Sequence, residues 1–323
     1  MSDNDNSNSA AETGNPDFEE KMPGRTVGFV IMFLMIASVA VILSRHSEQA
    51  DSTPAASVDQ SLDAFRSDAW MLPDDEMLGF VEIPAGAFTM GSNPTLDRMA
   101  YENERWSSSS RQGTVDLPTF YISRYEVTIA QFREFAEATG LPAEIAAIDG
   151  SGDDPVANIS WPEALAYGRW LQRQLQQSAQ TPAVLNQLFQ AGARLTLPSE
   201  AEWEKAARST DGRVFPWGSQ PQSGRANFAS RAVVGVGSIA CDTCAYGLSD
   251  MSGNVWELTR SPLQGYPYDP ADDRDNLADD ALWVMRGGSY ADAINNVRVA
   301  VRGGVDPGVH SDSIGFRLVI TSL

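Results

Sequence analysis

The alternation of apolar and polar positions changes along this chain in a way that predicts four successive segments. Residues 1–25 are polar and acidic, a composition typical of a disordered tail. Residues 26–44, TVGFVIMFLMIASVAVILS, carry no charge, and as a helix they would reach about 28 Å, close to the thickness of a bilayer's hydrocarbon core. Residues 45–77 are rich in Ser, Asp, Ala and Pro and predict a stalk, whereas residues 78–323 show the short apolar periods of a folded domain.

Within the domain, residues 78–92 (LGFVEIPAGAFTMGS) alternate apolar residues and then turn on glycine, which predicts a pair of strands. Residues 119–128 (TFYISRYEVT) predict a further strand. Helices are expected to follow, each beginning at a capping residue: Thr128, Ser160 and Ser199. Glu163 and Glu202 lie three residues after the second and third of these caps, as in a capping box, and Gly140 is expected to end the first helix.

Beyond Arg208 the chain becomes rich in Gly, Asn, Asp and aromatic residues and shows no long helical period, which predicts loops and short strands. Residues 314–320 (IGFRLVI) predict a final strand. The pattern as a whole indicates one α+β domain with much irregular structure. Because ordering a residue costs roughly 1–2 kcal/mol of backbone entropy, we expect bound cations or buried tryptophans to hold such loops in place.

The charged residues narrow the range of partners. A formal net charge of −20 argues against nucleic-acid binding, which needs clustered Lys and Arg. His46 and His310 are the only histidines, so a His-rich iron or zinc site cannot form. A Ser-His-Asp triad would have to depend on His310, because His46 adjoins the apolar segment, and we do not expect one.

We interpret the apolar segment 26–44 as a retained single membrane span. A cleavable signal peptide is the alternative, but 25 residues precede the segment and no clear small-x-small cleavage site follows it. Lys21 and Arg25 before the segment outweigh Arg45 after it, which favours a cytoplasmic N-terminus. We therefore expect a single-pass protein of the cell inner membrane, with its globular domain in the periplasm or another extracytoplasmic space.

An acidic turn, DMSGNVWEL, follows in the irregular part of the domain. Asp250 and Glu257 bracket Ser252, Gly253 and Asn254, and the glycine lets the chain fold back so that nearby carbonyls point inward. Carboxylate and carbonyl oxygens suit a hard cation such as calcium. A capped turn, with Glu257 as a surface carboxylate, is the simpler interpretation of the spacing alone.

Cys241 and Cys244 are the only cysteines and form a Cys-x-x-Cys unit just before this turn. We interpret them as a structural disulfide that fixes the loop entering the turn, because no thioredoxin-like strand-helix pattern surrounds them. A redox pair and half of a soft-metal site are the alternatives. Asp242, which lies between the two thiols, opposes thiolate formation.

The domain carries a series of motifs in this order: IPAGAFTMGS, FYISRYEVTIAQFREF, PVANISWPEALAYGRWL, RLTLPSEAEWEKAAR, FPWG, GLSDMSGNVWEL, MRGGSY and IGFRLV. Together they closely resemble the formylglycine-generating enzyme family, also called sulfatase-modifying factors. The resemblance covers nearly all of residues 78–323. It implies a C-type-lectin-like α+β fold with little regular structure, here preceded by a transmembrane helix.

Calcium is the cofactor that this resemblance implies. The acidic turn would bind it through two carboxylates and two backbone carbonyls, those of Asp250, Glu257, Gly253 and Val255. The sequence RANF matches the start of the family's other calcium site, at Asn227 and Phe228. The stretch that follows is shorter here than in the animal enzymes of the family, and the remaining ligands of that second site have no counterpart we can place.

Copper is not expected, although members of the family that generate formylglycine hold it with a pair of cysteines just after a GGSY motif. Thiolates suit Cu(I), which is soft. The matching positions here are Asp292 and Val297, and neither offers sulfur. The rest of the family's pocket corresponds to Trp256, Ser289, Tyr290 and, in place of a usual Asn, Ser313. A related branch that holds iron with histidines is excluded by the histidine count.

These observations predict a membrane-anchored, sulfatase-modifying-factor-like protein that acts with a protein or peptide partner in extracytoplasmic maturation or assembly. Copper-dependent formylglycine formation is not expected, and whether the domain is an enzyme of another kind stays open. The alternative is a ligand-binding C-type-lectin-like module, because residues 290–313 are mostly small or polar, as in diversified binding variants of this scaffold. Residues 172–193 are an insertion relative to the family, either a surface addition of one or two helices or a docking site.

Overall fold

The computed structural model of the chain describes residues 76–141, 149–276 and 281–322. The predicted tail and membrane span, and the stalk up to residue 75, lie outside the described residues. Within the described ranges, no helix combines the length and the apolar character that a membrane crossing requires.

The described strands form three sheets. The first has the order β1 (Phe80–Ile83), β4 (Phe120–Ser123), β10 (Val319–Thr321) and β5 (Arg194–Thr196). The second pairs β2 (Gly86–Met90) with β3 (Gly113–Leu117). The third has the order β8 (Arg302–Val305), β7 (Trp283–Arg286), β6 (Trp256–Pro262) and β9 (Ile314–Gly315), with β6 and β9 parallel. Short 3-10 turns complete the irregular parts, at Glu102–Glu104, Ala245–Gly247, Pro270–Asp272 and Ile294–Asn296.

The longer helices begin where the local sequence predicts. Three of them start after a capping box: α2 (Ile129–Thr139), α4 (Trp161–Gln177) and α6 (Glu200–Arg208). Their caps are Thr128, Ser160 and Ser199, as expected, and Gly140 ends α2 with a left-handed φ of 67°. Within the described residues, the remaining α-helix is α5 (Ala183–Gln190).

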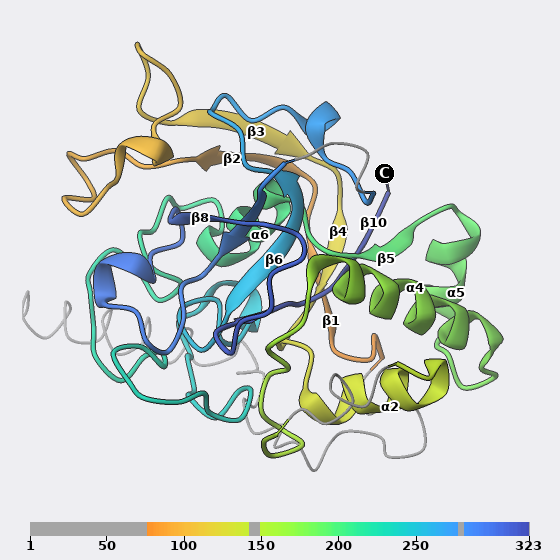
Figure 1. Cartoon of the computed structure of the whole chain (residues 1–323). Coiled ribbons are helices and arrows are strands. Elements are labelled where there is room, and N and C mark those ends of the chain that lie inside the picture. Colours follow the sequence, from red (N-terminus) through yellow and green to blue (C-terminus); the bar gives the residue numbers. More distant parts are fainter. Residues whose placement is uncertain (1–75, 142–148, 277–280, 323) are drawn as a thin grey trace, which may run out of the picture. The chain divides into compact units, whose positions relative to one another are not determined.

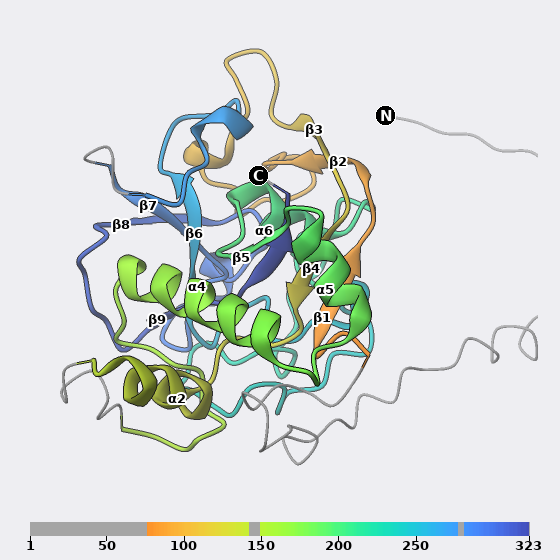
Figure 2. The ribbon, with the colours of Figure 1, turned by 90° about the vertical axis from the view of Figure 1, so that its right-hand side faces the viewer.

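Both faces of the first sheet are covered, as Figures 1 and 2 show. Ile320 of β10 and the preceding Leu318 pack into the core cluster that includes the buried faces of α2, α4 and α5. Val319 between them packs with α6 and strands β2 and β3. This alternation follows from the two-residue period of a strand, and it makes β10 the central element of an α+β fold.

Two of the strand predictions need correction. Residues 78–92 do form two strands, β1 and β2, but β1 pairs with β4 and β2 with β3. Lys205 of α6 fixes the bend between them, because its Nζ atom donates to the carbonyls of Pro84 and Gly86 at 2.7 and 2.8 Å. Residues 314–320 form two short strands, β9 and β10, in different sheets, because Arg317 between them is drawn into the core by Glu257.

The insertion at residues 172–193 forms the end of α4, the whole of α5 and the approach to β5. Leu175, Leu185 and Phe189 from this stretch are buried in the main core cluster. The insertion is therefore an integral layer of the domain and adds the helix that the sequence suggested.

Candidate functional site

The acidic turn before β6 requires glycine at residue 253. Gly253 has a φ of 75°, and a Cβ atom there would lie 2.1 Å from the carbonyl oxygen of Asn227. The close approach lets the Asn254 backbone N–H donate to that same carbonyl at 2.8 Å. Gly253 thus joins the segment around Asn227 to the turn and fixes where the flanking carboxylates lie.

Glu257 lies at the start of β6 and is fully buried. Its Oε1 atom accepts from Arg317 Nη2 at 2.7 Å, and its Oε2 atom accepts from Arg317 Nε and Trp203 Nε1, each at 2.6 Å. Arg317 also donates to the carbonyls of Ser123, Arg124 and Ser249. The pair therefore ties the start of β6 to the C-terminal segment and to the end of β4.

A further carboxylate, Glu126, lies close to this pair and was missed by the sequence reasoning. It is buried, and it accepts from Asn254 Nδ2 at 2.7 Å and from the Val255 backbone N–H at 3.2 Å. Burial raises the pKa of Glu126 well above its usual range, and the negative charges of Asp250 and Glu257 raise it further. The motif SRYEVT offered no signal for this role, because the partners of Glu126 lie 128 and 129 positions away.

Asp250 completes the acidic cluster, which we define as Glu126, Asp250 and Glu257. Its Oδ2 atom accepts from the Gly237 backbone N–H at 2.7 Å, and the chain adopts a left-handed φ of 58° there. Burial raises the pKa of Asp250 to about 6, against the lowering effects of that hydrogen bond and of Arg317. The cluster thus sets three carboxylates against one guanidinium.

The acidic cluster offers three carboxyl groups, and a calcium ion bound beside them would favour their charged forms. Asp250 lies where the resemblance implies a ligand, and Glu126 adds a carboxylate beside it. Glu257, however, already has a cationic partner in Arg317, so it would have to share its oxygens with an ion. Among the described residues, no three His, Cys, Asp or Glu side chains converge as a metal centre of side chains alone would require.

The predicted second calcium position lies directly beside the first. The Asn227 side chain donates to Asn254 Oδ1 at 3.1 Å and to the Ala232 carbonyl at 3.0 Å, and it accepts from the Ser230 hydroxyl at 2.6 Å. Phe228 packs instead against an apolar cluster formed by Val214, Phe215, Trp217 and Val297. Asn227 therefore supports the acidic turn through hydrogen bonds, whereas Phe228 belongs to the packing on its other side.

Asp292, at the first of the positions where the family holds copper, is bound by donors on both of its oxygens. Its Oδ2 atom accepts from Trp256 Nε1 at 2.9 Å, from the Ser289 backbone N–H at 3.0 Å and from the Ser289 hydroxyl at 2.7 Å. Its Oδ1 atom accepts from Asn296 Nδ2 at 3.0 Å. The predicted pocket residues Trp256 and Ser289 thus converge on Asp292, but they occupy its carboxylate.

Val297, at the second copper position, is fully buried in an apolar cluster with Val214, Phe215 and Trp217. Cys241 and Cys244, which form a disulfide in the structure, pack against this same cluster. The cysteines thus come close in space to a segment more than fifty positions later in the chain. Because their sulfur atoms are bonded to each other and Val297 offers no ligand, the residues present do not fit a Cu(I) centre.

Tyr290, which the resemblance also assigned to the pocket, lines an open groove of about 770 Å³. Its polar lining residues include Asn158, Arg231, Tyr290, His310, Ser311 and Asp312. Burial raises the pKa of Tyr290, as do the charge and hydrogen bond of Asp312. Ser313 joins the groove to the Asp292 network, because its carbonyl accepts from the Trp256 backbone N–H at 2.8 Å and its hydroxyl lies 3.0 Å from that of Ser311.

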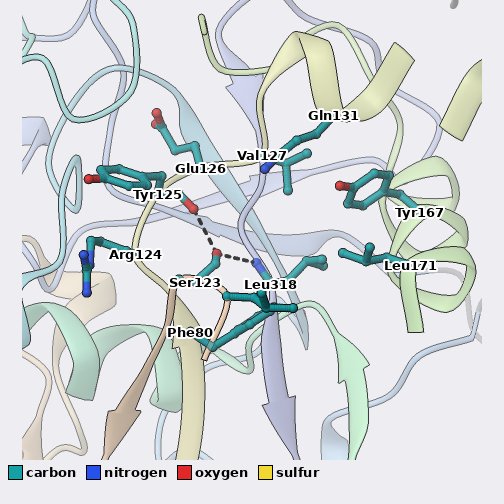
Figure 3. A pocket seen from close by; sticks show the side chains of 12 residues that line it. Phe80, Ser123, Arg124, Tyr125, Glu126, Val127, Gln131, Tyr167, Leu171 and Leu318 are labelled. Atoms are coloured by element: carbon teal, nitrogen blue, oxygen red, sulfur yellow. Dashed lines mark hydrogen bonds between the residues drawn. The ribbon is translucent and has the colours of Figure 1, made fainter. Parts of the chain in front are cut away.

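A second, much smaller cavity lies between β1, β4 and α4 and is drawn in Figure 3. Its volume of about 30 Å³ is enough for a water molecule, and Phe80, Tyr167 and Leu171 give it an apolar lining. The Ser123 hydroxyl also lines the cavity; it donates to the Tyr125 carbonyl at 2.9 Å and accepts from the Leu318 backbone N–H at 3.1 Å. This cavity belongs to the packing of the core, and the groove beside Tyr290 is the better candidate for binding.

Comparison with known protein families identifies a domain that spans the folded part of the chain. The model of the sulfatase-modifying factor enzyme 1-like domain matches residues 71–322. Hercynine oxygenase of Mycolicibacterium smegmatis is 30% identical over an alignment of 269 residues that covers 69% of this chain and 56% of that protein, so the chain spans little more than half of this relative. Inactive C-alpha-formylglycine-generating enzyme 2 of Bos taurus is 29% identical over 321 residues, covering 78% of this chain and 91% of the relative.

Solved structures show the same fold. The structure of PvdO from Pseudomonas aeruginosa has a TM-score of 0.59 and 23% identity, covering 75% of this chain and 93% of PvdO. Treponema denticola variable protein 1 has a TM-score of 0.56 and 23% identity, covering 75% and 94%. The α+β fold with mixed helices and strands that the motifs implied is therefore confirmed for the described domain.

Proposed function

Because this chain belongs to the family of sulfatase-modifying factor enzyme 1-like domains, we propose that it acts in protein maturation or assembly without copper-dependent formylglycine formation. We propose further that residues 26–44 anchor it in the inner membrane and that the folded domain works in the extracytoplasmic space. The relative named as an inactive formylglycine-generating enzyme is similar over most of both chains, which is consistent with this part of the proposal.

The hydrogen bonding of the Asp292 carboxylate is the observation that supports the proposal most directly. Where the resemblance implies a pair of sulfur ligands, Asp292 offers a carboxylate held by Trp256, Ser289 and Asn296, and Val297 offers an aliphatic side chain. This hydrogen-bond network lies beside an open groove, to which Ser313 connects it. Such a groove suits an extended segment of a client protein, bound through the polar side chains that line it.

Copper binding and turnover test this proposal. We expect the purified full-length chain to form no tight stoichiometric Cu(I) complex and to produce no aldehyde from a Cys-x-Pro-x-Arg peptide, because it lacks a thiolate pair at the site. The formylglycine-generating enzyme of Streptomyces coelicolor, a relative 28% identical to this chain, serves as the positive control in the same assay. Aldehyde formation above the copper-only background would overturn the proposal.

A ligand-binding module is the second candidate function. The groove favours it, because Arg231, His310 and Asp312 offer both signs of charge and several hydrogen bonds in one open surface. The genomic neighbourhood separates the two functions. A reverse transcriptase with a template repeat beside the gene favours a diversified binding protein, whereas an operon of maturation proteins favours the first candidate.

We also propose that calcium binds at the acidic turn and stabilises it. The residues that would hold it are Asp250, Glu257 and the carbonyls of Gly253 and Val255, with Glu126 as an added carboxylate. Free calcium at 100 times the Kd of the site would raise the free energy of unfolding by about 2.7 kcal/mol. A calcium chelator is therefore expected to lower the melting temperature by several degrees. Magnesium in place of calcium is the control, and an unchanged melting curve together with metal analysis that finds no calcium would contradict the proposal.

A further inference from the structure

A hollow of about 330 Å³ between α4 and β5 collects arginines in an otherwise acidic protein. Its lining includes Arg169, Arg173, Arg194, Gln172, Gln176 and Thr196. Four of these residues lie three, four and seven positions apart on α4, and so they share one face of the helix. Figure 2 shows α4 lying across the sheet that contains β5. We call this feature the arginine hollow.

The charges of the arginine hollow are unbalanced within the described residues. Asp275 is shared by two of the arginines, with Oδ2 lying 3.7 Å from Arg169 Nη2 and 3.5 Å from Arg194 Nη1. The Arg173 side chain makes no hydrogen bond or ion pair with any described residue. Three guanidiniums therefore face one carboxylate, which leaves two positive charges in a chain whose net charge is −20.

Thr196 provides an independent observation at the same place. It lines the hollow and is only 4% exposed, and its hydroxyl has no hydrogen-bond partner among the described residues. A buried hydroxyl without a partner is costly and is usually matched by a ligand or a water molecule. A donor beside three arginines is suited to an oxyanion.

The shape of the hollow excludes an added strand. β5 is an edge strand, but α4 covers its free edge, because Gln172 Oε1 accepts from the Leu195 backbone N–H at 3.0 Å. Gly168 lies so close that a Cβ atom there would be 3.1 Å from the Leu195 carbonyl oxygen. The hollow therefore suits a compact ligand and offers no free backbone edge to an extended peptide.

We propose that the arginine hollow binds a phosphate-type oxyanion with two negative charges, carried by a small phosphorylated molecule or by the headgroup of an anionic lipid. Guanidinium groups bind such oxygens through paired N–H donors, and Thr196 adds a hydroxyl. The site is separate from the groove beside Tyr290 and does not depend on the function proposed above.

Calorimetric titration of the full-length chain with inorganic phosphate and with glycerol 3-phosphate tests the soluble source of the ligand. Arg173→Gln and Arg169→Gln are each expected to weaken binding about tenfold, and Thr196→Val about fivefold. Arg98→Gln removes the same charge from an exposed residue outside the hollow and is expected to leave the affinity unchanged. The exposed arginine side chains contribute little to folding, so the melting temperature of the arginine variants should stay the same.

Vesicles test the lipid source. If the ligand is a headgroup, the chain binds vesicles containing phosphatidic acid more tightly than vesicles of phosphatidylcholine, and Arg173→Gln removes this difference while Arg98→Gln keeps it. Saturable binding in either arm with loss in the hollow variants supports the proposal. Absence of binding in both arms, or an equal loss in Arg98→Gln, overturns it.

Discussion

Arg317→Met is expected to lower the free energy of unfolding by about 3–5 kcal/mol, because it leaves the buried Glu257 carboxylate without its charged partner. The Arg317 side chain is fully buried and donates to both Glu257 oxygens and to three backbone carbonyls. Methionine keeps an unbranched side chain but supplies none of these donors. Chemical denaturation in a buffer with a calcium chelator measures the loss without any contribution from a bound ion.

A double variant shows whether the loss comes from the unpaired charge. Glu257→Gln in the Arg317→Met background removes the isolated carboxylate, so the double variant should be less destabilised than the sum of the two single variants. Arg98→Met, at an exposed position, controls for the general effect of removing an arginine. A loss below about 1 kcal/mol in Arg317→Met, or strict additivity in the double variant, would contradict the role given to this pair.

Gly253→Ala is expected to destabilise the domain by about 3–5 kcal/mol, through a strained backbone and a collision with a neighbouring segment. The φ of 75° costs an L-residue free energy by itself, and the new Cβ atom would lie 2.1 Å from the Asn227 carbonyl oxygen. That oxygen already accepts the Asn254 N–H, so it cannot move away without breaking the contact that joins the two segments. Thermal and denaturant unfolding measure the effect.

Gly212→Ala is a matched control for this variant, because Gly212 has the same φ of 75° and a Cβ atom there would meet nothing within 4 Å beyond its chain neighbours. It isolates the backbone strain and is expected to cost about 1 kcal/mol. The difference between the two variants is the cost of the collision. Equal losses for the two would show that the contact with Asn227 does not hold the acidic turn in place.

The helices of this fold that begin with a capping box could be predicted from local sequence signals. Thr128, Ser160 and Ser199 each begin a helix because the capping residue and its partner three positions later lie within one turn of each other. The strand pairings were less predictable, since β1 and β2 look alike in sequence and the choice of partner depends on distant strands.

In the candidate site too, residues within known motifs could be predicted, whereas residues whose partners are distant in sequence could not. Trp256, Ser289 and Asp292, which the resemblance assigned to a pocket, contact one another in the structure. Glu126 was missed, because nothing near it in sequence shows that Asn254 and Val255 will reach its carboxylate. The contact of the Cys241–Cys244 disulfide with the cluster around Val297 was likewise invisible, since only the folded chain brings them together.

The way α4 covers β5 has a consequence for the solubility of the protein. An uncovered edge strand offers unpaired backbone groups to other copies of the chain and promotes aggregation. Gln172 blocks that edge at its centre, and Leu185 and Phe189 of the same insertion are held in the core. Removing residues 172–193 would therefore expose the edge of β5 and part of the apolar core, and the truncated protein is expected to aggregate. Precipitation of such a variant would result from this exposure and would not show that a binding partner had been lost.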